Sequence, residues 1–294
     1  MTHLAVGRGT VVGPVGRPGT GVPRGVATTL GTDALRLRPR SAAMLVFVGA
    51  LGLLAFTWPL ILDPSSLVGS DRTGATVAPV ILGVIMLVAV GLLLVELTGG
   101  DMDVKAVAML GVLGAVGAVV RPLGAGSAGL ETIFFLLILA GRAFGPGFGF
   151  VLGAVALFAS ALLTGGVGPW LPYQMLGAGF VGLGAGLLPW RRGPRPVAEL
   201  GLLGVYGVVS SFVYGYLTDL AFWPFVFGAG MTPIGFDPAL GPWVNLRHFV
   251  VVNTATSLAW NIGRSVTTLV LLILLGRPLL RIFRRVARRA RFAG

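Results

Sequence analysis

The chain contains no cysteine, only one lysine and few acidic residues. The absence of cysteine excludes disulfides, thiolate metal ligands and cysteine nucleophiles. The single lysine, Lys105, lies outside any GxxxxGK[ST] pattern, so the chain has no P-loop with which to hydrolyse ATP. The motifs HExxH and GxSxG and paired-carboxylate patterns are missing as well. We therefore predict no catalytic residue, no metal site and no cofactor, and expect a protein that is not an enzyme.

Charged residues are also scarce, at 11% of the chain against 55% hydrophobic residues. A soluble domain carries roughly 25% charged residues, so this chain has too few to cover a surface that faces water. Several apolar runs reach the roughly 20 residues that a helix needs to cross a bilayer. The net charge of +12 comes from arginines at the termini and in alternate loops, as in membrane proteins, and does not indicate nucleic-acid binding. The composition predicts a polytopic α-helical membrane protein.

We predict eight spans, at residues 42–62, 76–98, 103–121, 130–144, 146–164, 172–190, 198–219 and 247–276. The fourth is short enough to be tilted or partly re-entrant, and residues 221–230 are expected to form an interfacial loop or half-helix. Placing both termini in the cytoplasm gathers most arginines on that side, which gives a multi-pass protein of the cell membrane. The remaining segments are two basic cytoplasmic tails, residues 1–40 (disordered) and 277–294. The second tail fits either an ordinary stop-transfer tail or a short helix on anionic lipid.

Small residues recur four positions apart in the third span. The pairs Gly111 with Ala115 and Gly114 with Ala118 each place small side chains on one helical face. The sixth span has a similar series, with Gly177, Gly179, Gly182, Gly184 and Gly186. Such faces serve either internal helix packing or docking against another membrane subunit, and the pattern alone leaves both open.

Polar residues form a stripe along the last span, from Asn253 to Arg264, and a second stripe in the preceding span. Aromatic and amide groups without acid–base pairs suit the binding of a flat or amide-rich solute. The alternative is an aromatic belt with interhelical hydrogen bonds. We expect Arg264 to turn inward or to pair with Glu199. The candidate solute-binding residues are Trp170, Tyr173, Gln174, Tyr214, Asn245, Asn253, Ser257, Trp260 and Asn261.

Two strings resemble a known family. They are ETIFFLLILAGRAFGPGFGFVLG at 131–153 and GGVGPWLPYQMLGAGFVGLGAGLLP at 165–189. Both are similar to the substrate-binding S components of energy-coupling factor (ECF) vitamin transporters, most of all to the cobalamin type from actinobacteria. The resemblance covers residues 103–276. It implies an all-α bundle with a six-helix S-component-like core, preceded here by two extra transmembrane helices within 41–102.

The resemblance also implies a function and partners. An S component binds a vitamin at the outer face of the membrane and associates with a transmembrane T subunit and two ATPases. The family's T-subunit docking motif matches Gly111, Gly114, Ala115 and Ala118. Cobalamin is the expected cargo, with riboflavin or thiamine as alternatives on the same scaffold, and the long loop 220–246 is expected to widen the outer cavity for a corrinoid. A self-sufficient secondary transporter is the competing hypothesis, although the spans contain few of the acidic residues that proton coupling requires.

Overall fold

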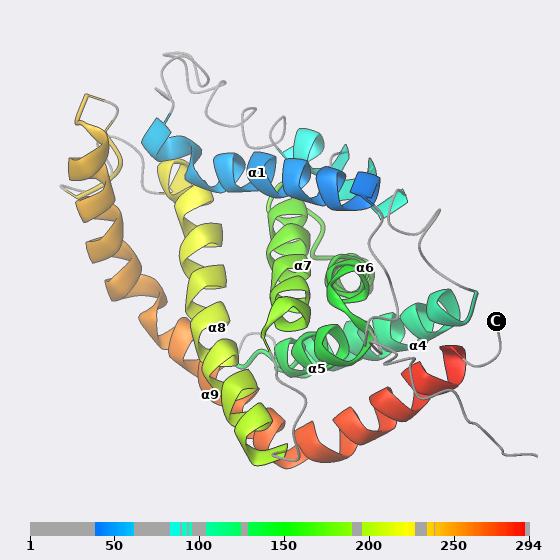
Figure 1. Ribbon diagram of the computed structural model, residues 1–294. Helices are drawn as coiled ribbons and strands as arrows, with labels where there is room; N and C mark the ends of the chain where they lie inside the picture. Colours follow the sequence, from blue (N-terminus) through cyan, green and yellow to red (C-terminus); the bar gives the residue numbers. More distant parts are fainter. Residues whose placement is uncertain are drawn as a thin grey trace, which may run out of the picture. The chain divides into compact units, whose positions relative to one another are not determined.

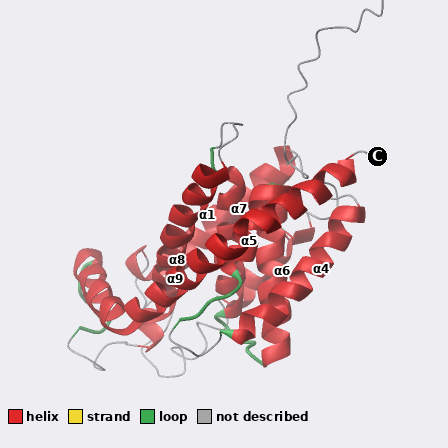
Figure 2. Ribbon diagram, turned by 90° about the horizontal axis from the view of Figure 1, so that it is seen from below, coloured by secondary structure: helices red, strands yellow, loops and turns green. Residues whose placement is uncertain are grey.

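Every regular element among the described residues is a helix, as Figure 2 shows. The computed structural model describes residues 39–61, 83–88, 90–92, 94–95, 104–124, 129–189, 196–226, 234–237 and 239–291. All of them lie in the compact unit Thr32–Gly294. The predicted all-α class is confirmed. The predicted N-terminal tail, apart from its last residues, lies outside the described residues.

Figure 1 shows the helices in their order along the chain. They are α1 (Pro39–Ile61), α4 (Val104–Val120), the 3₁₀ turn η1 (Arg121–Leu123), α5 (Phe134–Phe144), α6 (Pro146–Thr164), α7 (Leu171–Leu187), α8 (Pro196–Val226) and α9 (Pro242–Arg291). Residues 83–88 and 90–92 are helical as well. Five helices, α1, α4, α6, α8 and α9, contain segments long and apolar enough to cross a membrane. The chain is therefore a multi-pass membrane helix bundle.

Helix α5 is too short to cross a bilayer by itself. Its 11 residues extend about 16 Å, roughly half of the ~30 Å hydrocarbon core, and nearly all of them are buried. It ends at Gly145, whose φ of 108° is one that residues with a Cβ rarely adopt, and α6 begins at the next residue. This helix is consequently enclosed by its neighbours.

Two helices are longer than the sequence predicted. Helix α8 continues through Val226, so residues 221–226 belong to a spanning helix and the expected interfacial loop is wrong for them; residues 227–230 lie outside the described part. Helix α9 continues past Gly276 to Arg291 and contains Pro278. The predicted tail at 277–294 is thus helical up to Arg291. Figure 1 shows that α9 changes direction towards its red C-terminal part, as a proline inside a helix favours.

The centre of the bundle is a seam of glycines between α5, α6 and α7. A Cβ at Gly141 or Gly149 would lie 1.9 Å or 2.4 Å from the carbonyl oxygen of Gly182. A Cβ at Gly153 would lie 2.4 Å from the Ala178 carbonyl oxygen. No side chain fits between these backbones, so each of these positions requires glycine. The glycines of the predicted sixth span therefore serve packing within the bundle.

Helix α1 belongs to the same bundle, although it precedes the predicted six-helix core. Trp58 Nε1 donates a hydrogen bond of 2.9 Å to the Ala221 carbonyl of α8. The Phe56 ring contacts the Tyr173 ring of α7 edge to face, with centroids 5.5 Å apart. Helix α1 thus covers part of the surface formed by α7 and α8.

Candidate functional site

Arg264 lies at the centre of a polar cluster between α8 and α9. Its Nη1 donates to Asn261 Oδ1 at 2.8 Å and to the Ser211 carbonyl at 3.1 Å. Its guanidinium lies 4.9 Å from the centroid of the Tyr214 ring and 5.7 Å from that of Phe134, within cation–π range. The hydrogen-bond and ring partners of Arg264 are thus neutral amide, carbonyl and aromatic groups, while the carboxylates of Glu131 and Asp219 are near enough to act on it electrostatically.

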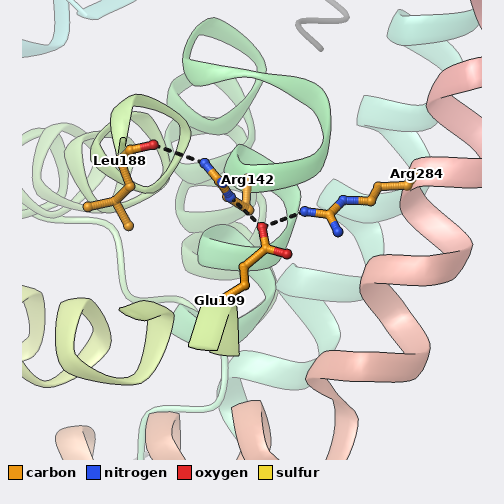
Figure 3. A network of polar contacts seen from close by, with 4 residues as sticks. All are labelled: Arg142, Leu188, Glu199 and Arg284. Carbon is orange, nitrogen blue, oxygen red and sulfur yellow. Dashed lines mark hydrogen bonds and ion pairs between the residues drawn. The ribbon is translucent and has the colours of Figure 1, made fainter. Parts of the chain in front are cut away.

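Of the two expectations for Arg264, that it turns inward is confirmed and that it pairs with Glu199 is wrong. The Glu199 carboxylate accepts a hydrogen bond of 2.8 Å from Arg142 Nε and another from Arg284 Nη2 (Figure 3). Arg142 Nη1 also donates to the Leu188 carbonyl at 3.0 Å. We call Glu199, Arg142 and Arg284 the Glu199 hub. It joins α5, the end of α7, α8 and the last part of α9, and Glu199 itself is only 3% exposed. Its role is to hold these helix ends together.

A carboxylate from α8 extends the polar cluster towards the start of α9. Asp219 accepts a hydrogen bond of 2.7 Å from Asn253 Nδ2, and the Ser257 side chain lies close to the same carboxylate. The stripe that the sequence predicted along α9 therefore faces α8 from Asn253 to Arg264. The acidic Asp219 of α8 and the basic Arg264 of α9 therefore both lie between these two helices.

The connection before α5 closes the cluster on another side. Glu131 Oε1 lies 4.0 Å from Arg121 Nε, and Arg121 Nη2 approaches Gln174 Oε1 at 3.5 Å. Burial raises the pKa of the Glu131 carboxyl, against the lowering effect of Arg121 and Arg264. Gly129 has a φ of 77°, and its backbone is pressed against that of Trp260 on α9. Residues 129–133 thus contact Arg121 of η1 and Trp260 of α9, and Arg121 in turn contacts Gln174 of α7.

Several buried polar atoms of this cluster have no hydrogen-bond partner among the described residues. The donors are Asn261 Nδ2 and Arg264 Nε, and the acceptor is Asn253 Oδ1. Arg121 Nε and Glu131 Oε1 also lack a hydrogen bond, but they face each other as an ion pair at 4.0 Å. Asn261 and Asn253 are 1% and 2% exposed. Leaving a buried polar group unsatisfied costs about 1–3 kcal/mol, and such groups are rare in folded proteins. The cluster can therefore offer donors and acceptors to a polar solute.

The predicted solute-binding residues divide into three groups. Tyr214, Asn253, Ser257 and Asn261 lie in the cluster. Gln174 and Trp260 lie at its edge: the Gln174 side chain contacts Arg121, and the Trp260 backbone contacts Gly129. The structure places the other three predicted residues outside it, as the next paragraph describes.

Tyr173 is buried between the rings of Phe56 and Phe222. Asn245, in the first turn of α9, binds the segment that precedes this helix, because its side-chain amide donates hydrogen bonds to the Asp237 and Leu240 carbonyls. Its Oδ1 accepts a hydrogen bond from the Asp237 amide, so its side chain is already occupied. Trp170, just before α7, is 46% exposed.

The candidate solute-binding residues predicted from the sequence omitted four charged residues of this cluster, although the polar stripe along the last span included Arg264. Arg121, Glu131, Asp219 and Arg264 all contribute a charge to it. The available signal was a charged side chain at or inside an apolar span, which is costly and therefore points to function. These charges come from segments far apart in the sequence, so their proximity depends on the fold.

The predicted docking residues of α4 differ in burial. Gly114 and Ala118 are buried, and the position of a Cβ on Gly114 lies 3.5 Å from Val155 of α6. Gly111 and Ala115 are exposed, and a Cβ on Gly111 would meet no atom within 4 Å. Exposed valines surround the second pair, among them Val112, which is 65% exposed. Only Gly111 and Ala115 are therefore accessible to another protein.

The chemistry of the cluster is that of binding. The described residues contain no group of three histidine, cysteine, aspartate or glutamate side chains that could hold a metal ion. Tyr214 and Phe134 supply aromatic surfaces beside a guanidinium and two amides. Such a set can recognise ring edges, carbonyls and amides of a solute.

A family model described as "ECF transporter, substrate-specific component" matches residues 105–277. The matched region begins in α4 and ends in α9, so it includes the entire polar cluster and excludes α1. No curated protein and no solved structure matches the chain at a significant level.

Proposed function

The chain belongs to the substrate-specific components of ECF transporters, which are membrane subunits of importers and not enzymes, and we propose that it binds its solute at the cluster around Arg264. The observation that carries this proposal is the set of buried polar atoms of Asn253, Asn261 and Arg264 on α9 that have no hydrogen-bond partner among the described residues, beside the Arg121–Glu131 pair. They offer hydrogen-bond donors and acceptors together, beside the rings of Tyr214 and Phe134.

For the cargo, we propose a vitamin, with cobalamin first and riboflavin or thiamine as alternatives. Cobalamin carries amide groups around a flat macrocycle, and amides satisfy donors and acceptors such as those of Asn253 and Asn261. The string GGVGPWLPYQM, which resembles cobalamin-type S components, supports the same choice. The expected loop 220–246 is shorter than predicted, because residues 220–226 belong to α8 and residues 242–246 to α9. Residues 227–233 and 238 between these helices lie outside the described part, and the proposed widening of the cavity rests on their sequence.

We further propose that a T subunit and two ATPases provide the energy for import. The chain itself has no P-loop. The exposed pair Gly111 and Ala115 on α4 supports a docking surface there, because small residues let a partner helix approach closely. Gly114 and Ala118 would act by packing α4 onto α6. In this arrangement the Glu199 hub and both termini face the cytoplasm, and the Arg264 cluster opens outward.

Mass spectrometry of small molecules that co-purify with the full-length protein tests the cargo first. Equilibrium binding of cobalamin, riboflavin and thiamine then ranks the candidates. Binding of riboflavin or thiamine without any binding of cobalamin would refute cobalamin. Wild-type affinity for every cargo in Arg264→Gln would refute the location of the site.

Reconstitution of the chain alone into vesicles separates a binding subunit from a self-sufficient carrier. A binding subunit captures its solute and accumulates none against a gradient. Concentrative import by the lone chain would overturn the division of labour proposed here, whatever the cargo.

A further inference from the structure

A groove of about 640 Å³ lies between α8 and α9, away from the Arg264 cluster. Its walls are almost entirely apolar. Residues from both helices line it, among them Val197, Gly201, Val208, Leu269, Ile273 and Arg277. Neither the proposed solute site nor the α4 surface uses this groove.

The groove exists because α8 carries glycines where larger residues would fill the space. A Cβ at Gly201 would meet no atom within 4 Å. At Gly204 it would lie 3.0 Å from the Leu269 side chain, so the groove narrows there. A leucine at position 201 would therefore extend into the groove, and its Cβ would clash with no neighbouring atom.

The length of the groove matches one leaflet of a membrane. Its residues on α8 run from Val197 to Val209, about 18 Å along a helix. One leaflet contributes about half of the ~30 Å hydrocarbon core, and α8 is one of the membrane-spanning helices. An extended acyl chain would thus lie along the groove over its whole length.

One end of the groove is positively charged. Among the described residues of its lining, Arg277 alone carries a charge. It begins a series along α9 with offsets of 0, 4, 7, 8 and 11 residues, which share one helical face. The series is Arg277, Arg281, Arg284, Arg285 and Arg288. A phosphate near Arg277 would therefore also meet Arg281, one turn further along α9, whereas Arg284 is held by Glu199 and Arg288 lies about three turns away.

The Glu199 hub keeps this charged segment in place. Arg284 binds Glu199 (Figure 3), and Leu280, Phe283 and Ala287 are buried on the adjacent face. The Phe283 ring lies 5.4 Å from the ring of Phe144, centroid to centroid. The end of α9 is therefore fixed to the bundle, with Arg277, Arg281 and Arg288 left exposed.

We propose that this groove is a binding site for an anionic phospholipid, with an acyl chain between α8 and α9 and the phosphate at Arg277 and Arg281. The apolar lining accepts a chain from any lipid, and the guanidinium groups select the charge of the headgroup. The proposal does not depend on the identity of the cargo or on the T subunit.

Native mass spectrometry of the full-length protein tests the site, with phosphatidylglycerol and phosphatidylcholine of equal chain length titrated in parallel. We expect phosphatidylglycerol to be retained preferentially. Arg277→Gln should weaken its retention about five-fold, the typical effect of one arginine near anionic lipid. Gly201→Leu should reduce the retention of both lipids by filling the groove. Arg288→Gln is the matched control, because it removes one exposed arginine outside the groove lining and should retain phosphatidylglycerol as the wild type does.

Three results would overturn the proposal. They are equal retention of the two lipids, an unchanged affinity in Gly201→Leu, and an equal loss in Arg277→Gln and Arg288→Gln, which would indicate general electrostatic attraction. Inorganic phosphate is added in a further arm, and displacement of phosphatidylglycerol by millimolar phosphate would assign the arginines to a free anion. Thermal unfolding of each variant in detergent verifies that it is folded.

Discussion

Glu199 and Arg264 are both charged residues inside an apolar bundle, and their surroundings differ. Glu199 accepts hydrogen bonds from two arginines on two other helices, and neither of its carboxylate oxygens is buried without a hydrogen-bond partner. Arg264 contacts neutral groups, and its Nε and the neighbouring Asn261 Nδ2 have no partner among the described residues. The first arrangement is complete without a ligand, whereas the second gains hydrogen bonds when a polar ligand enters.

The difference separates stability from binding. A buried carboxylate held by two guanidinium groups is costly to disturb, because removing one partner leaves charge in a medium that solvates it poorly. A guanidinium surrounded by amides and rings can exchange or add partners at little cost. Substitutions in the two regions should therefore change different measured quantities.

The largest effect is expected from Glu199→Gln. This substitution removes the negative charge that Arg142 and Arg284 share, and breaking a buried ion pair in this way costs about 3–5 kcal/mol. Thermal or denaturant unfolding in detergent measures the loss. Solute affinity of the folded fraction should remain that of the wild type. A variant as stable as the wild type would show that the hub does not hold the helix ends.

Arg264→Gln should give the opposite result. Solute affinity should fall about 10- to 100-fold, the cost of losing hydrogen bonds to a charged group, while stability changes little because the guanidinium has neutral partners. Isothermal titration measures the affinity. Tyr206→Phe is a matched control on α8, since Tyr206 donates its hydrogen bond to the Val181 carbonyl outside the cluster. Equal losses of affinity in both variants would contradict the assignment.

Helix α4 extends the comparison to uncharged residues. Gly111→Leu should weaken assembly with the T subunit roughly ten-fold and leave stability and solute affinity unchanged, because position 111 is exposed. Co-purification with the T subunit measures the assembly. Gly117→Leu serves as the buried counterpart and should destabilise the protein, since a Cβ there would already lie 3.1 Å from Ala156. Normal assembly of Gly111→Leu would place the docking surface elsewhere.

The smallest effect is expected from Arg284→Gln. The Arg284 side chain is 40% exposed, so water replaces part of its interaction with Glu199, and partly exposed ion pairs contribute about 1 kcal/mol or less. Unfolding measurements beside Glu199→Gln test this ranking. A loss as large as that of Glu199→Gln would show that Arg284, and not Arg142, provides most of the stabilisation.

Long apolar runs made most of the helices predictable, because hydrophobic length determines which segments cross a bilayer. Two boundaries were not predictable from length. Pro224 and Pro278 both lie inside helices that continue past them, although proline favours a helix end. The short helix α5 was identified as unusual, and its enclosure by neighbouring helices explains why it does not need the full length.

The candidate site was only partly predictable. The spacing along α9 identified Asn253, Ser257 and Asn261 because helical periodicity is local. The partner of Glu199 was not predictable, since Arg142 and Arg264 are both arginines in spans and only the fold distinguishes them. The two small-residue pairs of α4 look equivalent in the sequence, and their different burial depends on where α6 lies. Tyr173 and Asn245 are of residue types that are common in binding sites. In the fold, however, Tyr173 packs against other rings and Asn245 bonds to backbone groups of the same chain.

The glycine seam between α5, α6 and α7 has a mechanical consequence. Where backbones touch directly, as at Gly149 and Gly182, there are no intervening side chains whose rotamers can change, and densely packed interfaces of this kind do not deform gradually. These three helices should therefore move as one solid block. Any displacement that admits or releases a solute must be taken up by α8 and α9 sliding against that block, at the face where Arg264 resides.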